Sequence, residues 1–218
     1  MSCTILHMEQ RTPEWLAARC GRVTASRAKD VLAMSKKGGG ELAARRDYRM
    51  ELALERIFGR PMESGYQNDD MRRGVELEPL ALNAYEAREA VFVRRTGFIL
   101  HDELPIGVSL DGDLDNLTGL VEAKAPRPAN HWAYLEAGVV PPDYLPQLVH
   151  GQLVTGAQWT DFVSFCPDFG PLALFVVRYE RDEAAIASYR LMLEQFLAEV
   201  EKEEAAIRVR LDAAAVAA

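Results

Sequence analysis

The order of the expected elements predicts a mixed α/β (α+β) protein with a central mixed β-sheet flanked by helices. Helical patterns fill most of the first 90 residues, and a block rich in glycine, proline and β-branched residues then indicates strands. A pair of helices, two further strands and a long helix complete the chain. Because this order leaves two sheet faces to bury, helices are expected on both sides.

The helices of the first 90 residues are recognised by their start and stop signals. Thr12 supplies a capping hydroxyl before Pro13, and Gly21 is placed to end that helix. Thr24 is expected to cap the second helix, and Pro79 to interrupt the fourth. The four helices are expected over residues 13–21, 24–33, 41–58 and 69–89.

The rest of the chain alternates between strands and helices. A terminal helix from about residue 182 carries Ile186, Tyr189, Leu193 and Phe196 at helical spacing, which is typical of core packing. Strands are expected over residues 91–100, 106–110, 118–123, 160–166 and 172–179, and helices over 128–137 and 144–155. At 218 residues the chain suits one domain, with a helical part over about 1–90, a sheet core over about 91–180 and a final helix over about 182–210.

The net charge of −8 is unevenly distributed. Residues 1–73 hold 14 Lys and Arg against 10 Asp and Glu, whereas residues 74–218 hold 11 against 23. Basic groups can therefore line one surface while the acidic excess lies elsewhere, so the sign of the total does not exclude a nucleic-acid partner.

The cysteines and histidines lack metal-ligand spacing. Three cysteines fit reduced thiols, and the four scattered histidines form no zinc pattern. The N-terminus lacks the pattern of a signal peptide, and no apolar run approaches the roughly 20 residues of a membrane span. The expected location is the cytoplasm, with no membrane partner.

The most informative motif joins Asp111 to Glu122 and Lys124. Residues 108–110 are expected to form a strand that ends at Asp111, and residues 118–123 the next one. Paired as a hairpin, the two would set Asp111 beside Glu122. Glu122 and Lys124 share a strand face because side chains alternate. Two hard oxygen ligands for a divalent cation, with an ammonium beside an attacking water, suit metal-assisted phosphodiester hydrolysis.

Two other interpretations of the same residues stay open. Asp111, Asp113, Asp115 and Glu122 occupy positions 1, 3, 5 and 12 of a twelve-residue EF-hand-like calcium loop, although Asn116 stands where such a loop needs glycine. The prolines on both sides also oppose flanking helices. The third interpretation is an ordinary acidic turn between strands.

Four blocks of residues resemble the lambda exonuclease (YqaJ-type viral recombinase) branch of the PD-(D/E)XK nuclease superfamily. The resemblance covers roughly residues 9–180. The blocks, in the family's order, are EQRTPEW at 9–15 with RCGRVTAS at 19–26, RGVELE at 73–78, SLDG at 109–112 with VEAK at 121–124, and YLPQ at 144–147. The implied fold is a restriction-endonuclease-like core.

The resemblance implies a role for each matched residue near the metal. Asp111 and Glu122 would bind metal with the backbone carbonyl of Ala123, and Lys124 would orient or deprotonate the water. Glu78 would complete the shell and Gln147 would lie close to it; a solvent-facing acid and a helix-capping residue are the alternatives. The implied cofactor is Mg²⁺, two ions per site, with Mn²⁺ as a substitute.

The remaining implied residues contact DNA. Arg19 and Ser26 resemble the family's pocket for a 5′-terminal phosphate, with Arg22 and Ser109 assisting, since Thr24 to Ser26 would open a helix whose free N–H groups attract anions. Met71 resembles a wedge that splits the end base pairs. Residues expected on the wall of a DNA channel are Lys36, Lys37, Arg45, Arg72 and Arg73.

The implied function is a Mg²⁺-dependent 5′→3′ exonuclease of phage or prophage origin. It would processively degrade the 5′-phosphorylated strand of linear duplex DNA and leave a 3′ overhang for recombination by strand annealing. A homotrimeric ring and a single-strand annealing protein are the implied partners. The alternatives are a site-specific or structure-specific endonuclease of the same superfamily, and a non-catalytic protein that binds DNA ends or calcium.

Overall fold

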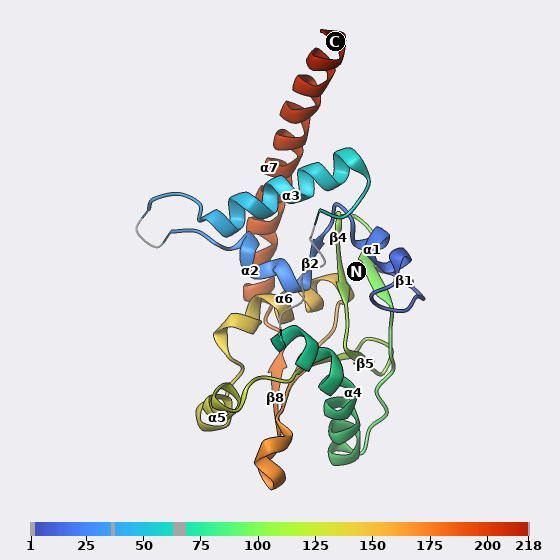
Figure 1. Cartoon of the computed structure of the whole chain (residues 1–218). Helices are drawn as coiled ribbons and strands as arrows, with labels where there is room; N and C mark the ends of the chain where they lie inside the picture. The colour runs from blue at the N-terminus through green and yellow to red at the C-terminus, as the bar shows by residue number, and fades with distance from the viewer. Residues whose placement is uncertain (1–2, 36–37, 63–68, 218) are drawn as a thin grey trace.

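The protein folds into two four-stranded sheets with helices around them (Figure 1). The computed structural model describes residues 3–35, 38–62 and 69–217. In chain order the elements are β1 (Cys3–Leu6), α1 (Pro13–Arg19), β2 (Val23–Thr24), η1 (Ala25–Arg27), α2 (Ala28–Val31), α3 (Ala43–Phe58), α4 (Asp69–Glu89), β3 (Phe98–His101), β4 (Ile106–Ser109), β5 (Gly112–Leu114), β6 (Gly119–Lys124), α5 (Pro128–Ala137), η2 (Pro142–Tyr144), α6 (Leu145–Thr155), β7 (Trp159–Phe165), η3 (Pro167–Leu172), β8 (Leu174–Glu180) and α7 (Glu183–Val216).

The first sheet has the strand order β1-β3-β4-β2. Strands β1 and β3 are antiparallel, as are β3 and β4, whereas β2 runs parallel to β4. The sequence analysis missed β1, whose four residues show no strand pattern long enough to recognise, and the two-residue β2. The expected strand over residues 91–100 is wrong at its start, because only Phe98–His101 is paired as a strand.

The second sheet has the order β5-β6-β7-β8, with β6 and β7 parallel and the outer pairs antiparallel. The chain passes from the first sheet to the second between Ser109 and Gly112. The mixed α/β class is therefore confirmed, and the central sheet is divided in two at Asp111. The expected hairpin is shifted accordingly: β5, and not the strand at 106–110, pairs with β6.

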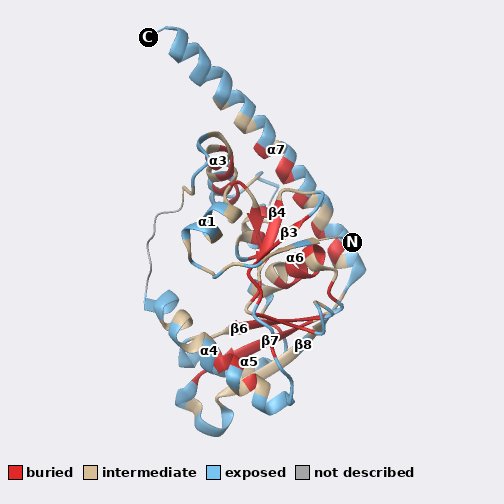
Figure 2. Ribbon diagram, turned by 90° about the vertical axis from the view of Figure 1, so that its right-hand side faces the viewer, coloured by how far each residue is buried: buried red, intermediate tan, exposed pale blue. Residues whose placement is uncertain are grey.

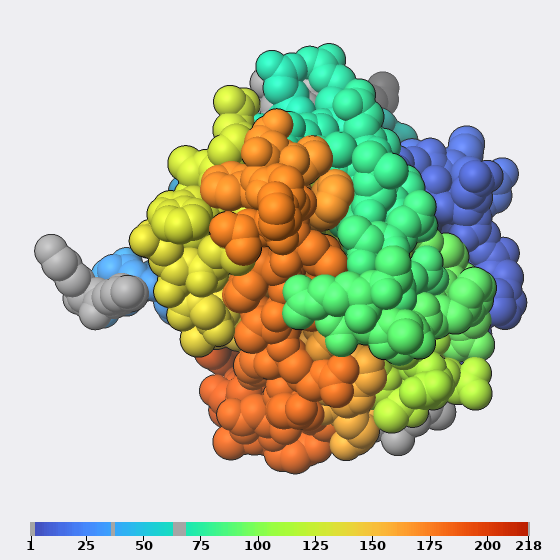
Figure 3. All heavy atoms as spheres, turned by 90° about the horizontal axis from the view of Figure 1, so that it is seen from below, coloured from blue at the N-terminus to red at the C-terminus, as the bar shows by residue number. Residues whose placement is uncertain are grey.

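Helix α6 packs between the sheets and α7, and its buried face joins the largest core cluster (Figure 2). Helix α4 contacts β6, β7 and β8 of the second sheet. Seen from one end of the molecule, β8 and the preceding loop lie between α5 and α4 (Figure 3). Burial of side chains such as Leu153 and Phe162 contributes roughly 1.5–3 kcal/mol each.

Two expected helices differ from the observed ones. Pro79 lies inside α4 without ending it, so the expected interruption is wrong. The second helix is reduced to a 3₁₀ turn followed by the single-turn α2. Helix α7 continues past the expected end near residue 210, and its final turns project from the body with exposed side chains (Figures 1 and 2). In the part of the chain described, no helix has the length and apolar character needed to cross a bilayer.

Candidate active site

The point where the chain changes sheets brings Asp111 to Glu122. Gly112 pairs with Val121 in the antiparallel β5–β6 ladder, so Asp111 lies opposite Glu122 and on the same face. The backbone N–H of Ala123 donates to Asp111 Oδ2 at 2.8 Å. The N–H and C=O of one strand residue point to the same side. The carbonyl of Ala123 is therefore directed toward Asp111.

Lys124 and Gln147 meet on the carboxylate of Glu122. Lys124 Nζ donates to Glu122 Oε1, and Gln147 Nε2 donates to the same oxygen at 2.6 Å. Gln147 lies in the first turn of α6, while Glu122 and Lys124 are two residues apart on β6. The Lys124 ammonium also lies 5.3 Å from the ring centre of Tyr144. The structure thus brings together four of the residues that the sequence selected: Asp111, Glu122, Lys124 and Gln147.

The electrostatics of this cluster are unbalanced. Burial and the neighbouring charge of Glu122 raise the pKa of Asp111 well above its ordinary value, and Lys124 opposes that shift only in part. Burial alone would lower the pKa of Lys124, but Glu122 and Asp111 raise it above its ordinary value. Lys124 is therefore a cation beside two carboxylates that repel each other.

The donor set fits a hard divalent cation. Among the described residues 3–35, 38–62 and 69–217, the backbone N–H of Ala123 donates a hydrogen bond to the Asp111 side chain. This hydrogen bond reaches only Oδ2. Glu122 accepts its recorded hydrogen bonds at Oε1 alone. One oxygen of each carboxylate thus remains for a metal, as magnesium and calcium prefer. No group of three His, Cys, Asp or Glu side chains in the described residues is close enough to form a ready-made metal site.

Glu78 lies near this pair but is engaged by arginines. Its carboxylate faces Arg11 and Arg95, each at 3.4 Å, and its charge contributes to raising the pKa of Asp111. Glu78 lies on α4 because Pro79 is accommodated within that helix. It is partly buried, so the alternative of a fully solvent-facing acid does not describe it.

The EF-hand-like arrangement does not form. Asp113 is fully buried and pairs with Arg94 at 2.8 Å, and it also accepts from Thr96 and from the N–H of Leu117. Its oxygens are therefore occupied by structural donors. Strands β5 and β6 lie where an EF-hand needs helices.

A second cluster lies two residues before Asp111. Ser109 Oγ accepts from Trp15 Nε1 at 2.8 Å and from Arg19 Nη1 at 3.5 Å. The guanidinium of Arg19 lies 4.1 Å from the ring centre of Trp15. Trp15, for which no functional role was predicted from the sequence, thus contacts two candidate phosphate ligands, Arg19 and Ser109. The sequence contained a signal for this contact, because Trp15 and Arg19 are four residues apart on a helix and therefore lie on the same face.

Ser26 and Gln147 line one hollow of about 170 Å³, together with Ala25, Lys29, Asp143 and Tyr144. Gln147 lines this hollow and also donates to Glu122, so the hollow lies beside Glu122 and Lys124. Lys29 and Tyr144 were not selected from the sequence. The expected helix capped by Thr24 is wrong, because a 3₁₀ turn and the single-turn α2 follow Thr24 and its side chain makes no cap.

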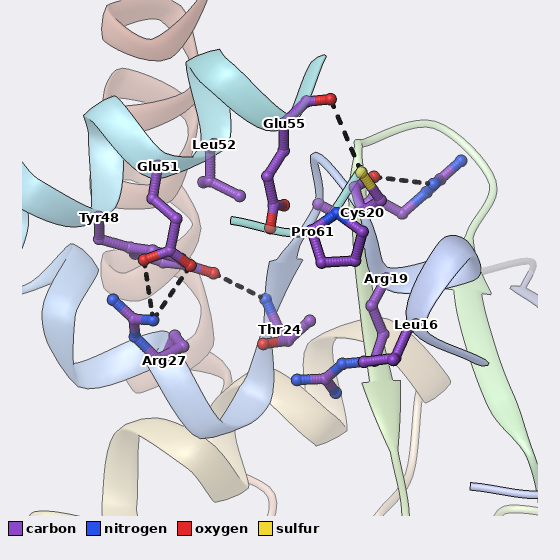
Figure 4. A pocket seen from close by; sticks show the side chains of 11 residues that line it. Leu16, Arg19, Cys20, Thr24, Arg27, Tyr48, Glu51, Leu52, Glu55 and Pro61 are labelled. Atoms are coloured by element: carbon purple, nitrogen blue, oxygen red, sulfur yellow. Dashed lines mark hydrogen bonds and ion pairs between the residues drawn. The ribbon is translucent and has the colours of Figure 1, made fainter. Parts of the chain in front are cut away.

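Arg19 also lines a smaller pocket with Arg22, Thr24 and Arg27 (Figure 4). Its volume of about 30 Å³ leaves room for only one or two waters. Glu51 pairs with Arg27 there at 3.2 Å. Arg22 donates to the carbonyls of Ala18 and Cys20 at the end of α1. Arg19 thus borders this narrow pocket and also contacts Ser109.

The expected channel residues have different environments. Arg45 is a correction: it is 5% exposed and pairs with Glu41 and Glu199, so it cannot line an open channel. Met71 is 54% exposed in the first turn of α4. Arg72 is exposed and pairs with Asp69, whereas Arg73 is half-buried near Cys166 and Asp168. Lys36 and Lys37 lie outside the described residues.

The fold and sequence are similar to solved exonucleases over most of the chain. An alkaline exonuclease (LHK-Exo) from Laribacter hongkongensis has 36% identity and a TM-score of 0.82, covering 92% of this chain and 98% of that chain. The structure of LHK-Exo in complex with dAMP has 37% identity and a TM-score of 0.81 over the same shares. A phage-related exonuclease from Haemophilus somnus 129PT shares the fold, at 15% identity and a TM-score of 0.63, over 87% of this chain and 96% of that one. Among curated proteins no match was found.

These similarities define the chain as a DNA nuclease of the exonuclease class. The model of the YqaJ-like viral recombinase domain matches residues 14–158, which include Arg19, Glu78, Asp111, the β6 motif and Gln147. The protein belongs to that family. The predicted family and the enzyme class are thereby confirmed.

Proposed function

We propose that this protein is a Mg²⁺-dependent 5′→3′ exonuclease that processively degrades the 5′-phosphorylated strand of linear duplex DNA. The observation that carries the proposal is the convergence of Asp111, Glu122 and Lys124 on one face where β5 begins and β6 ends. Family membership supports the reaction class. Burial and the charge of Glu122 raise the pKa of Asp111, and a bound cation would relieve both effects, which supports the proposal.

Asp111, Glu122 and the carbonyl of Ala123 would hold the metal, with Glu78 as a further ligand. Two Mg²⁺ ions, or Mn²⁺ in their place, would polarise the phosphate and stabilise the attacking and leaving oxygens. Lys124 would orient the water or accept its proton. Gln147 would fix the Glu122 carboxylate, since its amide donates to it at 2.6 Å.

The 5′ end would be held at the Trp15–Arg19–Ser109 cluster. A guanidinium binds phosphate through two parallel hydrogen bonds, which a lysine cannot reproduce. Ser26 would contribute from the neighbouring hollow. Ser109 and Asp111 lie two residues apart. A 5′-terminal phosphate bound at Ser109 would place the next phosphate of the strand at Asp111 for cleavage, so degradation would proceed in the 5′→3′ direction.

The proposed assembly is a homotrimeric ring whose channel carries Met71, Arg72 and Arg73. Such a ring would let an acidic chain keep a basic inner wall. We also propose that residues 1–218 act as one nuclease domain in the cytoplasm of a bacterial host. The single-stranded 3′ product would pass to a single-strand annealing protein for recombination.

The test uses linear duplex labelled at one 5′ or one 3′ end, with and without Mg²⁺, followed over time beside a closed circular plasmid. The proposal predicts loss of the 5′ label as mononucleotide, retention of the 3′ label on a long single strand, and an intact circle. The Lys124→Ala variant should be slower by about 10²–10⁴-fold, the usual worth of proton transfer by a positioned group. Discrete cuts in the circle would instead favour an endonuclease.

A further inference from the structure

Two arginines to which the family resemblance assigned no role converge on Glu78. Arg11 lies in the loop between β1 and α1, and Arg95 lies in the segment between α4 and β3. Arg11 Nη2 reaches Glu78 Oε2, and Arg95 Nη1 reaches Glu78 Oε1, both at 3.4 Å. The two segments lie side by side in both views that show them (Figures 1 and 3).

Arg95 also belongs to the active site through the backbone. Its Nη1 donates to the carbonyl of Asp111 at 3.2 Å. Arg19 contacts Ser109, two residues before Asp111. Guanidinium groups therefore contact the chain at both Ser109 and Asp111, next to the carboxylates of the site.

Both arginines form the solvent side of the site. Their side chains are 49% and 50% exposed, whereas that of Glu78 is 21% exposed. Exposed ion pairs of this kind contribute little to stability, so a change of partner costs little. Arg11 further adopts a φ of 68°, a left-handed conformation that is strained for a residue other than glycine. Strain of this kind clusters at functional sites.

We propose that Arg11 and Arg95 bind DNA backbone phosphates beside the scissile bond when Glu78 turns to the metal. This inference rests on the proposed function. In the metal-free protein the two guanidinium groups pair with the carboxylate of Glu78. When metal and DNA are bound, they pair with phosphates of the substrate instead. Their planar donor arrays suit phosphate oxygens better than the single long contacts they make with Glu78.

The experiment measures binding of a fluorescent, 5′-phosphorylated duplex in Mg²⁺ over a range of salt concentrations. It uses the Lys124→Ala background, which should degrade the duplex about 10²–10⁴-fold more slowly, and the binding is measured before cleavage becomes significant. Each phosphate contact adds about 0.9 to the slope of log K against log salt. The Arg11→Gln/Arg95→Gln pair should therefore reduce the slope by about 2. The Arg11→Lys/Arg95→Lys pair, which keeps both charges, should hold the slope near that of the background.

Arg190→Gln is the matched control, because this half-exposed arginine on α7 also pairs with carboxylates but lies outside the site. It should leave the slope unchanged. A second measurement follows Mg²⁺ binding without DNA, where the Gln pair should bind at least as tightly as the background. A slope equal to that of the background would overturn the proposal and leave the arginines as partners of Glu78 only. A background protein that fails to bind the duplex would instead contradict the proposed function.

Discussion

Charged side chains gather in two regions of the molecule with opposite consequences. Between α3 and α7, each arginine faces a carboxylate: Arg45 pairs with Glu199 at 2.5 Å, and Arg49 pairs with Glu41 at the same distance. Where β5 begins and β6 ends, Asp111 and Glu122 instead face each other, and Lys124 donates to Glu122.

The difference appears in the pKa values. The hydrogen bond from Arg49 lowers the pKa of Glu41, so the folded protein favours its charged form. Burial and Glu122 raise the pKa of Asp111, so the folded protein disfavours its charged form. Charges in the α3–α7 region stabilise the fold. Those where β5 begins and β6 ends cost stability until a cation binds.

Asp111→Asn should have the largest effect, because it should lower the rate of cleavage without lowering the stability of the metal-free protein. Cleavage should fall by at least about 10²-fold, because a metal ligand and its charge are lost. Without metal, the melting temperature should stay level or rise, since one of two repelling carboxylates becomes neutral. A nuclease assay and thermal unfolding in a chelator measure the two quantities.

Asp113→Asn is the matched control, because it makes the same change two residues away. Asp113 is buried and accepts from Arg94, whose side chain is partly exposed, so losing this charge-assisted contact should cost about 1–3 kcal/mol. If Asp111→Asn destabilised the metal-free protein as much as Asp113→Asn, the contrast between the regions would be wrong.

Arg19→Ala should affect recognition of the 5′ end. The guanidinium of Arg19 lies 4.1 Å from the ring centre of Trp15 and donates to the hydroxyl of Ser109, which places it two residues from Asp111. Loss of one charge-assisted contact costs about 1.5–3 kcal/mol. The preference for 5′-phosphorylated over 5′-hydroxyl ends should fall about 10–150-fold, as measured by competition between the two substrates.

The control for this prediction is Arg22→Ala, whose side chain braces the end of α1. It should keep most of the preference. Equal degradation of both ends by the unaltered protein would remove the basis for a phosphate pocket at Arg19.

Glu199→Gln tests the balanced region. Arg45 is buried and keeps Glu41 as a second partner, so we expect a loss of about 1–3 kcal/mol in the free energy of unfolding. Denaturant unfolding measures this loss. The rate of DNA cleavage should remain within about twofold of the parent once the protein is folded. A large loss of activity in fully folded protein would tie α7 to the site.

Acid should weaken the fold in two ranges. Burial lowers the pKa of His150 to about 4 from an ordinary 6.5, so the unfolded chain takes up this proton first as the pH falls. Stability therefore decreases from pH 6.5 to about 4, by up to about 1.4 kcal/mol per pH unit.

The carboxylates act lower on the pH scale. The pKa values of Glu41 and Glu199 are lowered from 4.5, so their contribution is present above that pH and is lost as the pH falls through the lowered values. Unfolding free energies measured for the parent and His150→Asn separate the ranges. Between pH 6.5 and 4, the slope of the unfolding free energy against pH should be smaller in the variant, by the equivalent of about one proton. An unchanged slope would rule out His150 as the cause.

The sequence predicted the features that depend on local pattern. Side-chain alternation placed Glu122 and Lys124 on one face, hairpin pairing set Asp111 beside Glu122, and family resemblance added Gln147. It did not predict the division of the sheet at Asp111, because pairing partners depend on contacts across the whole chain. It misjudged Arg45, since an arginine in a helix looks the same in sequence whether it faces solvent or Glu199. No role was predicted for Arg11, although it lies within the block at 9–15, or for Arg95, because only the folded chain brings both to Glu78.

The central claim is that Asp111 and Glu122 share a divalent cation beside Lys124. Titration calorimetry of the parent and of Asp111→Asn with Mg²⁺, at constant pH and without DNA, tests it most directly. The account predicts that the parent binds Mg²⁺ and that the variant binds at least tenfold more weakly. Equal binding by both proteins, or binding by neither, would contradict it.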